Sequence, residues 1–165
     1  MTRVIERLIQ AVRDAKIFNS EVQVAPACIL WPDSDRQWQS AISQLIEELP
    51  ELSIFPGSER LLLPALKAGG AGCISATANA NSMEMRQTYD AFERGVEGIE
   101  ERQERLNSIR SIFEQFAFAP ALKTWLASTQ SESRWLNLRP PLLKLSEKQS
   151  EQLFIDLQKV GFGMV

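Results

Sequence analysis

The sequence predicts an α/β fold, in which a small layer of about three parallel strands is followed by a helical C-terminal region. The first observation is a strand–helix–strand pattern between residues 52 and 75, with glycines at the turns. This pattern is typical of a βαβ unit in a parallel sheet. The second observation is that apolar residues beyond Gly95 recur at intervals of three and four, the spacing of amphipathic helices.

The first 51 residues predict a helix–strand–helix segment. An amphipathic helix is expected near the N-terminus, with an apolar face formed by Val4, Ile5, Leu8, Ile9, Val12 and Ala15. The next run, 22–31, is strand-like, and Pro26 confines its well-paired part to Ala27–Trp31. After a turn at 32–35, a second helix has the apolar stripe Trp38, Ala41, Ile42, Leu45, Ile46 and Leu49, and Pro50 ends it.

Residues 52–95 contain the predicted βαβ unit and one further helix. Strands are expected at Leu52–Phe55 and Gly72–Ser75, with a helix between them that ends before Gly69. Loops that follow the C-terminal ends of parallel strands commonly carry functional residues. The two stretches to search for a site are therefore Gly57-Ser58-Glu59 and Thr77-Ala78-Asn79. A helix capped by Asn81 or Ser82 should then run to Arg94, where Gly95 ends it.

Residues 96–165 are predicted to be helical. Ile99–Phe116 has an apolar stripe suited to packing on another helix, and we interpret the charged run 100–105 as its solvated face. Pro120 begins the next helix, and Arg139-Pro140-Pro141 fixes an extended connector. Ser146 and Gln149 form a capping box for the last helix, whose buried face is Leu153, Phe154, Leu157 and Val160.

Composition excludes several kinds of site. The chain has no histidine, which removes nucleophile–imidazole pairs and the common zinc sites, and no acidic loop suggests another metal. A net charge of −3 gives no reason to expect nucleic acid, and no apolar stretch is long enough to span a membrane. The N-terminus carries acidic residues, unlike a secretory signal. We therefore expect a cytoplasmic protein without cofactor or metal, in which Cys28 and Cys73 are reduced; a disulfide is the alternative.

Several motifs resemble one enzyme family. FPGSE, LPALKAGGAGCISATAN, PALKTWLA and LRPPLLKLSEKQ resemble, in order and spacing, the C-terminal part of the dihydrodipicolinate synthase and N-acetylneuraminate lyase family, and the resemblance covers residues 52–162. Those proteins are pyruvate-dependent class I aldolases on a (β/α)8 barrel, so the resemblance implies a partial barrel remnant. It implies a substrate-pocket remnant made of Gly57, Ser58, Glu59, Ile74, Ser75, Thr77 and Asn79. The alternative is that these small residues only permit tight turns.

The same resemblance implies that the family's chemistry is absent. Class I aldolases need a neutral lysine amine at a strand end to form a Schiff base with the ketone. When the sequence is laid on the family's pattern, Pro32 occupies that position, and the family's tyrosine motif and Gly-Thr-Thr loop are not found. The only tyrosine, Tyr89, falls in a predicted helix, and Lys67 falls at a helix end. No catalytic residue is therefore assigned.

The opening segment has a different resemblance. VAPACILWPDSDRQWQSAISQLIEELPEL resembles the N-terminal end of the PglZ family of phage-defence proteins, without that family's phosphatase core. The predicted organisation is therefore 1–51 (PglZ-like), 52–95 (the barrel-like unit) and 96–165 (helical). A natural fusion, a truncated gene and an engineered chimera all remain open.

Three functions follow as hypotheses. The first is a noncatalytic truncated or fused lyase relative that acts as an association module, since one face of the short sheet should lack its cover. The second is a lyase half-site that another chain completes with its lysine, which would bring a small keto-acid ligand. The third is an interaction module of a phage-defence system. All three expect self-association or a partner chain.

Overall fold

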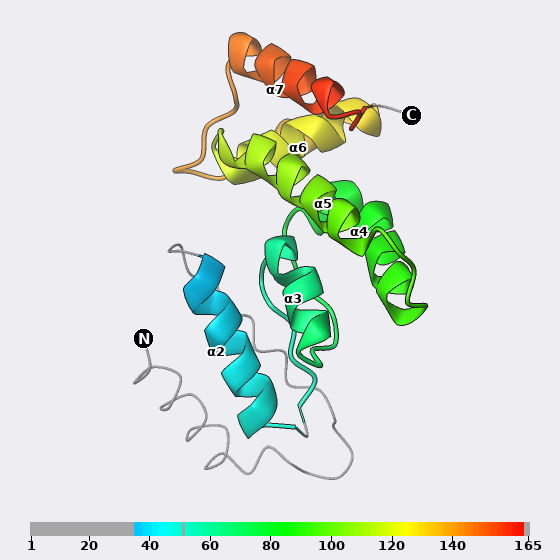
Figure 1. Cartoon of the computed structure of the whole chain (residues 1–165). Helices are drawn as coiled ribbons and strands as arrows, with labels where there is room; N and C mark the ends of the chain where they lie inside the picture. The colour runs from blue at the N-terminus through cyan, green and yellow to red at the C-terminus, as the bar shows by residue number, and fades with distance from the viewer. Residues whose placement is uncertain (1–34, 51, 164–165) are drawn as a thin grey trace.

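The computed structural model describes residues 35–50 and 52–163, with side chains from Ile42 onward. Its helices are α2 (Asp35–Glu48), α3 (Leu62–Lys67), α4 (Ala78–Glu93), α5 (Ile99–Glu114), α6 (Phe118–Thr129) and α7 (Glu147–Lys159), with short 3-10 turns η1 (Glu59–Leu61) and η2 (Ser133–Leu136). α2 and α3 form the lower part of the molecule, and α6 and α7 pack at the opposite end of α5 (Figure 1). Within the described residues, no helix is both long and apolar enough to cross a membrane.

The predicted strands are not regular in the described part of the chain. Segments 52–57 and 71–76 lie side by side, joined by hydrogen bonds from Ala71 N–H to the Ile54 carbonyl and from Ile74 N–H to the Pro56 carbonyl, both 3.0 Å. Neither segment is a strand, and the prediction of strands at Leu52–Phe55 and Gly72–Ser75 is wrong. The strand predicted at Ala27–Trp31, like the N-terminal helix and Cys28, lies outside the described residues.

Two residues explain why this pairing stays irregular. Pro56 has no N–H, so it cannot return the hydrogen bond that a parallel ladder requires. Between these two hydrogen bonds, segment 52–57 advances by two residues, from Ile54 to Pro56, whereas segment 71–76 advances by three, from Ala71 to Ile74. The second segment therefore has one extra residue near Gly72, as in a β-bulge. Gly72 has φ +146, and an added Cβ would lie 3.4 Å from the Phe55 ring. The bulge therefore needs glycine there.

α2 packs on the barrel-like unit rather than standing apart from it. Its buried side chains share one core with residues from 54 to 65, and this cluster comprises Ile42, Leu45, Leu49, Ile54, Leu61 and Ala65. The segment that precedes Leu52 and the unit that follows it thus bury apolar surface together, which stabilises both.

α4 begins earlier than the predicted cap. The helix starts at Ala78, and the capping prediction at Asn81 or Ser82 is wrong for the helix as a whole. However, Asn81 is non-helical, with φ −125° and ψ 29°, so the regular helix starts after it. The Asn81 amide is 2% exposed, and among the described residues it has no hydrogen-bond partner. The predicted end is confirmed, because Gly95 follows the helix with φ +62.

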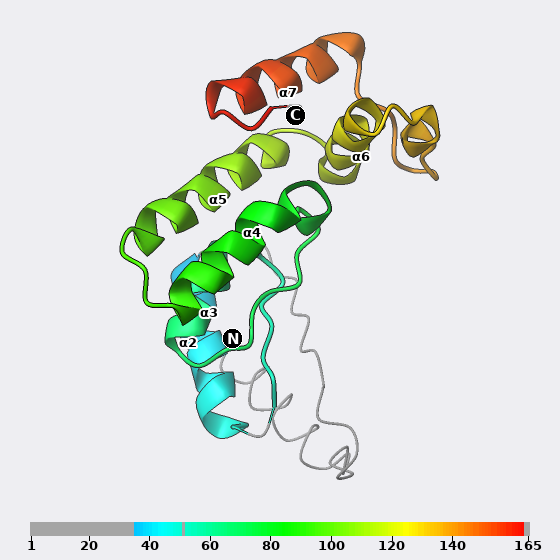
Figure 2. The ribbon, with the colours of Figure 1, turned by 90° about the vertical axis from the view of Figure 1, so that its right-hand side faces the viewer.

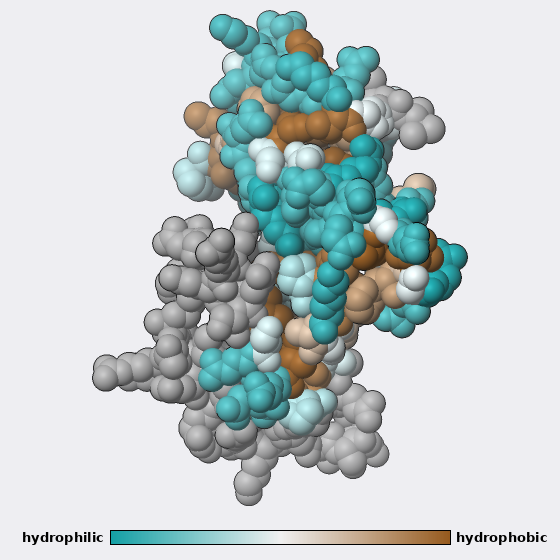
Figure 3. Space-filling model, in the orientation of Figure 1, coloured by the Kyte–Doolittle hydropathy of each residue, from teal (hydrophilic) through white to brown (hydrophobic). Residues whose placement is uncertain are grey.

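The helical region has its own core, as the apolar spacing predicts. Ile109 and Phe113 of α5, Ala121 and Leu122 of α6, and Leu153 and Leu157 of α7 form one buried cluster. α7 begins with the predicted capping box between Ser146 and Gln149. Figure 2 shows α7 lying across α5 and α6, and Figure 3 shows apolar residues in the band between α7 and the helices beneath it.

The interpretation of residues 100–105 as a solvated face is wrong at one position. Gln103 is 7% exposed and points toward η1 and α3, because it lies one helical turn before the fully buried Leu106. Arg105 pairs with Glu84 of α4 at 2.8 Å, and its guanidinium also donates to the Val160 carbonyl at 2.6 Å. Arg105 therefore joins α4 and α5 to the end of α7.

Candidate functional site

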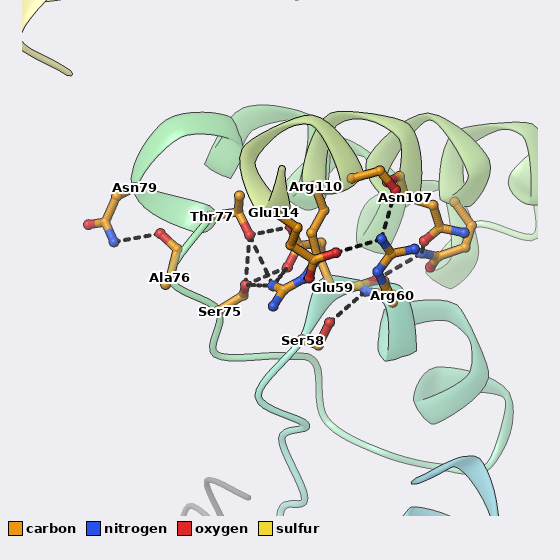
Figure 4. A network of polar contacts seen from close by, with 12 residues as sticks. Ser58, Glu59, Arg60, Ser75, Ala76, Thr77, Asn79, Asn107, Arg110 and Glu114 are labelled. Atoms are coloured by element: carbon orange, nitrogen blue, oxygen red, sulfur yellow. Dashed lines mark hydrogen bonds and ion pairs between the residues drawn. The ribbon is translucent and has the colours of Figure 1, made fainter. Parts of the chain in front are cut away.

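Glu59 lies at the centre of a buried polar network. It is the first residue of η1, and the Ser58 hydroxyl caps this turn by accepting a hydrogen bond from Arg60 N–H at 3.3 Å. The Glu59 side chain is 0% exposed and accepts hydrogen bonds from the hydroxyls of Ser75 and Thr77. Figure 4 shows these hydroxyls and the Arg110 guanidinium converging on the Glu59 carboxylate. The loops that follow the two extended segments therefore meet through one acidic side chain.

Arg110 neutralises this carboxylate from the C-terminal helical region. Its Nη1 lies 2.7 Å from Glu59 Oε2, and its side chain is 15% exposed. The same nitrogen lies 3.1 Å from Ser75 Oγ and 3.3 Å from Thr77 Oγ1. A carboxylate buried this completely requires a paired cation and hydrogen-bond donors, and Arg110 supplies the charge.

A second carboxylate holds Arg110 in place. Glu114, one turn later on α5, accepts from Arg110 Nε at 2.6 Å and from Arg60 Nη2 at 2.8 Å. Burial raises the pKa of Glu114, but the hydrogen bonds from Arg60 and Arg110 outweigh this and leave the pKa lowered. Burial lowers the pKa of Arg110, but the charges of Glu59 and Glu114 and the hydrogen bonds to both carboxylates together outweigh this and leave the pKa raised. Both side chains are therefore charged at neutral pH, and α5 is tied to η1 by alternating charges.

Gln103 fixes the backbone around Glu59. Its amide nitrogen donates to the Glu59 carbonyl at 2.8 Å, and its amide oxygen accepts from Leu63 N–H at 2.9 Å. A single buried amide thus satisfies a carbonyl of η1 and an N–H in the first turn of α3, where no intrahelical partner exists. The amide nitrogen also donates to Asn107 Oδ1 at 2.9 Å, which holds its orientation.

Cys73 lies near this network and is held as a thiol. Burial raises its pKa to about 12, the negative charge of Glu59 adds to the rise, and Arg110 opposes it. A thiol with this pKa carries almost no thiolate at neutral pH, and the thiolate is the reactive form. Cys73 is free in the structure, in agreement with the expected reduced state.

We predict that Cys73 reacts slowly with an aromatic disulfide reagent in the folded protein. In a Cys28→Ser variant at pH 8, the folded chain should react on the order of a hundredfold more slowly than the urea-unfolded chain, because reactivity follows the thiolate fraction. A Glu59→Gln substitution removes one cause of the raised pKa and should speed the reaction. Equal rates in the folded and unfolded chain would show that the thiol is neither buried nor held protonated.

The structure brings together only part of the predicted pocket remnant. Glu59, Ser75 and Thr77 meet in the network, while Ser58 caps η1 and Gly57 is buried beside it. Ile74 points away and is 49% exposed. Asn79 is exposed, donates to the Ala76 carbonyl at 2.8 Å, and lies on the far side of Ala76 from Glu59 (Figure 4). Whether any of these residues contacts a ligand stays a prediction.

Sequence reasoning missed the residues of α5 that complete the site, namely Gln103, Arg110 and Glu114. Arg110 lies 51 positions from Glu59, so no local spacing connects them. The signal that could have found them was the strand-end glutamate itself, because a buried carboxylate requires a cation nearby. In the described part of the chain, no group of three or more Cys, Asp or Glu side chains could hold a metal ion.

The comparison with known protein families shows to which family this chain belongs. The sequence profile of the Dihydrodipicolinate synthetase family matches residues 35–160, which is most of the chain. The chain belongs to the dihydrodipicolinate synthetase family. The match begins within residues 1–51, so it includes α2, which shares a core with the barrel-like unit. The likeness of residues 1–51 to the PglZ family, and the predicted boundaries at 51 and 95, stay predictions.

Individual relatives agree with this assignment. An uncharacterized DapA-like lyase of Chloroflexus aurantiacus is 35% identical over 131 residues, which are 79% of this chain and 43% of the relative. The dihydrodipicolinate synthase of Agrobacterium tumefaciens is 26% identical and superposes with a TM-score of 0.69 over 94% of this chain and 48% of its own.

A second similar structure is the prophage protein YagE of E. coli K12, a dihydrodipicolinic acid synthase family protein in complex with pyruvate. It superposes with a TM-score of 0.74 at 22% identity, over 94% of this chain and 51% of its own. The chain thus spans about half the length of the family members it matches. The irregular pair of segments and the helices around it fit an α/β fragment of this barrel family, as the resemblance implied.

Proposed function

We propose that this chain is a dihydrodipicolinate synthetase family protein that forms no Schiff base with a keto acid on its own and acts as an association module. The observation that carries the proposal is the state of the polar centre. Glu59, Ser75, Thr77 and Arg110 satisfy one another there, and among the described residues no lysine amine takes part in their hydrogen bonds. A class I aldolase requires an amine that can attack a carbonyl carbon.

The described lysines support this proposal because their amines are engaged or placed elsewhere. Lys67 pairs with Glu100 at 2.7 Å, and its side chain is 53% exposed. Lys123 donates to the Asn137 carbonyl, and Lys159 pairs with Asp156 at 2.8 Å. Lys144 precedes α7 and Lys148 lies in its first turn, and both side chains are exposed. A lysine nucleophile must instead be desolvated so that it is neutral at working pH.

Glu59 is also a poor candidate for acid–base catalysis. A useful general base must bind a proton near working pH and lie within reach of a substrate atom. Glu59 is 0% exposed, and the Arg110 guanidinium and the hydroxyls of Ser75 and Thr77 occupy its carboxylate oxygens, so no substrate atom lies within reach of them. A purely structural role, in which the network only holds two loops and α5 together, accounts for the hydrogen bonds among these four side chains.

Borohydride trapping tests the proposal. The purified chain is incubated with pyruvate and reduced, and its intact mass is then measured. We expect no mass increase from a reduced pyruvate adduct, since no lysine amine in the described part of the chain is placed to form the imine. A full-length dihydrodipicolinate synthase treated in parallel provides the positive control. A stoichiometric adduct on this chain, mapped to one lysine by peptide mass analysis, would overturn the proposal.

A second candidate function is a lyase half-site completed by another chain. The observation that favours it is the coverage of the alignment, which includes only 43% of the Chloroflexus aurantiacus relative. The trapping experiment is therefore repeated with a polypeptide that carries the unaligned part of that relative. An adduct on the added polypeptide that forms only when both chains are present would support the half-site. The phage-defence interaction stays a prediction, testable by co-purification with defence proteins.

A further inference from the structure

A surface pocket lies between α6, η2 and the first two turns of α7. Its volume is about 420 Å³. Small-molecule sites in proteins typically occupy about 300–1,000 Å³, so this pocket is large enough for a small organic ligand. Figure 1 shows the connector between α6 and α7 running beside α6, and this connector supplies part of the wall. None of the lining residues belongs to the polar network around Glu59, so the pocket is a separate feature of the molecule.

Thr124 places a buried hydroxyl without a partner in this pocket. The residue lies on α6, lines the pocket and is only 9% exposed. Thr88 and Thr129 donate their hydroxyls to carbonyls one turn earlier in their own helices, at 2.8 and 3.0 Å. The Thr124 hydroxyl makes no such bond and has no other partner in the part of the chain that the structure describes. Because a buried hydroxyl without a partner is costly, Thr124 indicates that a molecule in the pocket completes its hydrogen bonding.

Ser131 adds a second hydroxyl at an unfavourable backbone position. It lies just beyond the end of α6 with φ +51, and it is the only non-glycine residue with a positive φ among those described. Glycine is the usual residue at such a position after a helix, because a Cβ disfavours the left-handed conformation. The serine retains a hydroxyl on the wall of the pocket that glycine would lack.

Lys144 gives the pocket a single positive charge. It is the only charged side chain among the described residues that line the pocket, it is exposed, and it has no ion-pair partner in the described part of the chain. Of the acidic residues close to it in the sequence or the fold, Glu132 pairs with Arg134 at 2.6 Å, and Glu147 and Glu151 are exposed and lie outside the lining. One cation on a long, flexible stem suits a ligand with one negative charge.

The remaining wall of the pocket is mostly apolar. It includes Ala127 of α6, Leu136 of η2, Leu145 of the connector and Phe154 of α7, all of which are half-buried. Apolar surface that is still partly in contact with water becomes buried when an apolar ligand enters, and this burial favours binding. The ligand that fits the pocket therefore has an apolar body as well as its charge.

We propose that this pocket binds a small amphipathic monocarboxylate, such as a medium-chain fatty acid. The carboxylate accepts hydrogen bonds from the Lys144 amine and from the hydroxyls of Thr124 and Ser131, and the hydrocarbon chain packs against the apolar lining residues. A small ligand with one exposed cationic partner should bind weakly, with a dissociation constant on the order of 0.1–1 mM. The site does not depend on the absence of Schiff-base chemistry, so it can fail independently of the proposed function.

Titration of the isotopically labelled chain with octanoate, followed by NMR, tests the proposal. We expect saturable shifts of backbone amide signals from α6, η2 and the first two turns of α7. Two further ligands separate the contributions, since 1-octanol lacks the charge and acetate lacks the hydrocarbon chain. Each should bind at least about tenfold more weakly than octanoate, because each loses one of the two kinds of contact.

Substitutions in the pocket locate the binding. Thr124→Val keeps the shape of the side chain and should weaken octanoate binding about tenfold, because it removes a hydrogen bond to a charged group. Lys144→Met should weaken octanoate binding about threefold and leave 1-octanol binding unchanged. Ala127→Phe fills the pocket and should abolish binding. The matched control is Lys148→Met, which removes an exposed cation that does not line the pocket and should leave binding unchanged.

Circular dichroism and urea midpoints establish that each variant is folded, and Thr124→Val tests the site even if the larger side chain of Ala127→Phe prevents folding. The proposal is overturned if octanoate causes no saturable shifts up to about 10 mM, well above the expected dissociation constant. It is equally overturned if 1-octanol binds as tightly as octanoate, or if folded Thr124→Val binds octanoate as the unmodified chain does.

Discussion

Replacing Arg110 by methionine is expected to lower the free energy of unfolding by about 3 kcal/mol, since removing one partner of a buried ion pair leaves the other charge uncompensated. Glu59 would keep its hydrogen bonds from Ser75 and Thr77 but lose the cation 2.7 Å away. Methionine retains much of the aliphatic length of arginine, so most of the loss should come from the charge. Urea denaturation followed by circular dichroism measures it.

Two comparisons isolate this effect. Arg86→Met breaks an exposed i,i+4 pair with Asp90 on α4 and should leave the free energy of unfolding nearly unchanged, because exposed ion pairs contribute little. Glu59→Gln leaves Arg110 paired with Glu114 and partly exposed, so it should cost less than Arg110→Met. Equal small losses in all three variants would mean that the Glu59 carboxylate is not buried as the structure places it.

Phe113→Ala should cause the largest loss of stability in the helical region, about 4 kcal/mol, because it opens a cavity where three helices meet. Phe113 is 0% exposed and belongs to the core shared by α5, α6 and α7. The substitution leaves the polar network intact, so slow Cys73 reactivity should persist wherever the variant is folded. The urea midpoint of the variant measures the loss.

Ile155→Ala provides the matched control for this core substitution. Ile155 lies on α7 but is 49% exposed, so truncating it should change the free energy of unfolding by no more than about 0.5 kcal/mol. If Ile155→Ala cost as much as Phe113→Ala, the buried face of α7 would be assigned wrongly.

Local patterns predicted the helical region well because its signals lie close together in the sequence. The capping box needs only Ser146 and a partner three residues later, and Gly95 ends α4 through its own positive φ. The apolar stripe on α5 likewise predicted that Leu106, Ile109 and Phe113 would be buried, as they are. Each of these features depends on the chemistry of one helical turn.

The sheet was predicted less well because the apolar composition of a segment does not show how it pairs with its neighbour. Leu52–Phe55 and Gly72–Ser75 are apolar enough for strands, and the chain does bring them side by side. A ladder, however, depends on which N–H groups face the neighbour. Pro56 lacks the necessary donor, and the bulge at Gly72 shifts the register by one residue.

The sequence predicted only some residues of the polar network around Glu59. Because residues at the C-terminal ends of parallel strands are expected to lie close together, we predicted that Glu59, Ser75 and Thr77 share one site, and these three side chains are in contact. The same expectation placed Ile74 and Asn79 in the same pocket remnant, although the first is exposed and the second turns toward Ala76. It could not find Arg110, because the packing of α5 on η1 is a long-range event with no local sequence signal.

The most direct test of this account is the coupling free energy between Glu59 and Arg110 in a double-mutant cycle. Glu59→Gln, Arg110→Met and the double variant are compared with the unmodified chain by urea denaturation. We predict a coupling of about 2 kcal/mol, because a fully buried carboxylate depends on its paired cation. A coupling near zero would mean that Glu59 does not depend on Arg110, and it would contradict the account of a closed, noncatalytic centre.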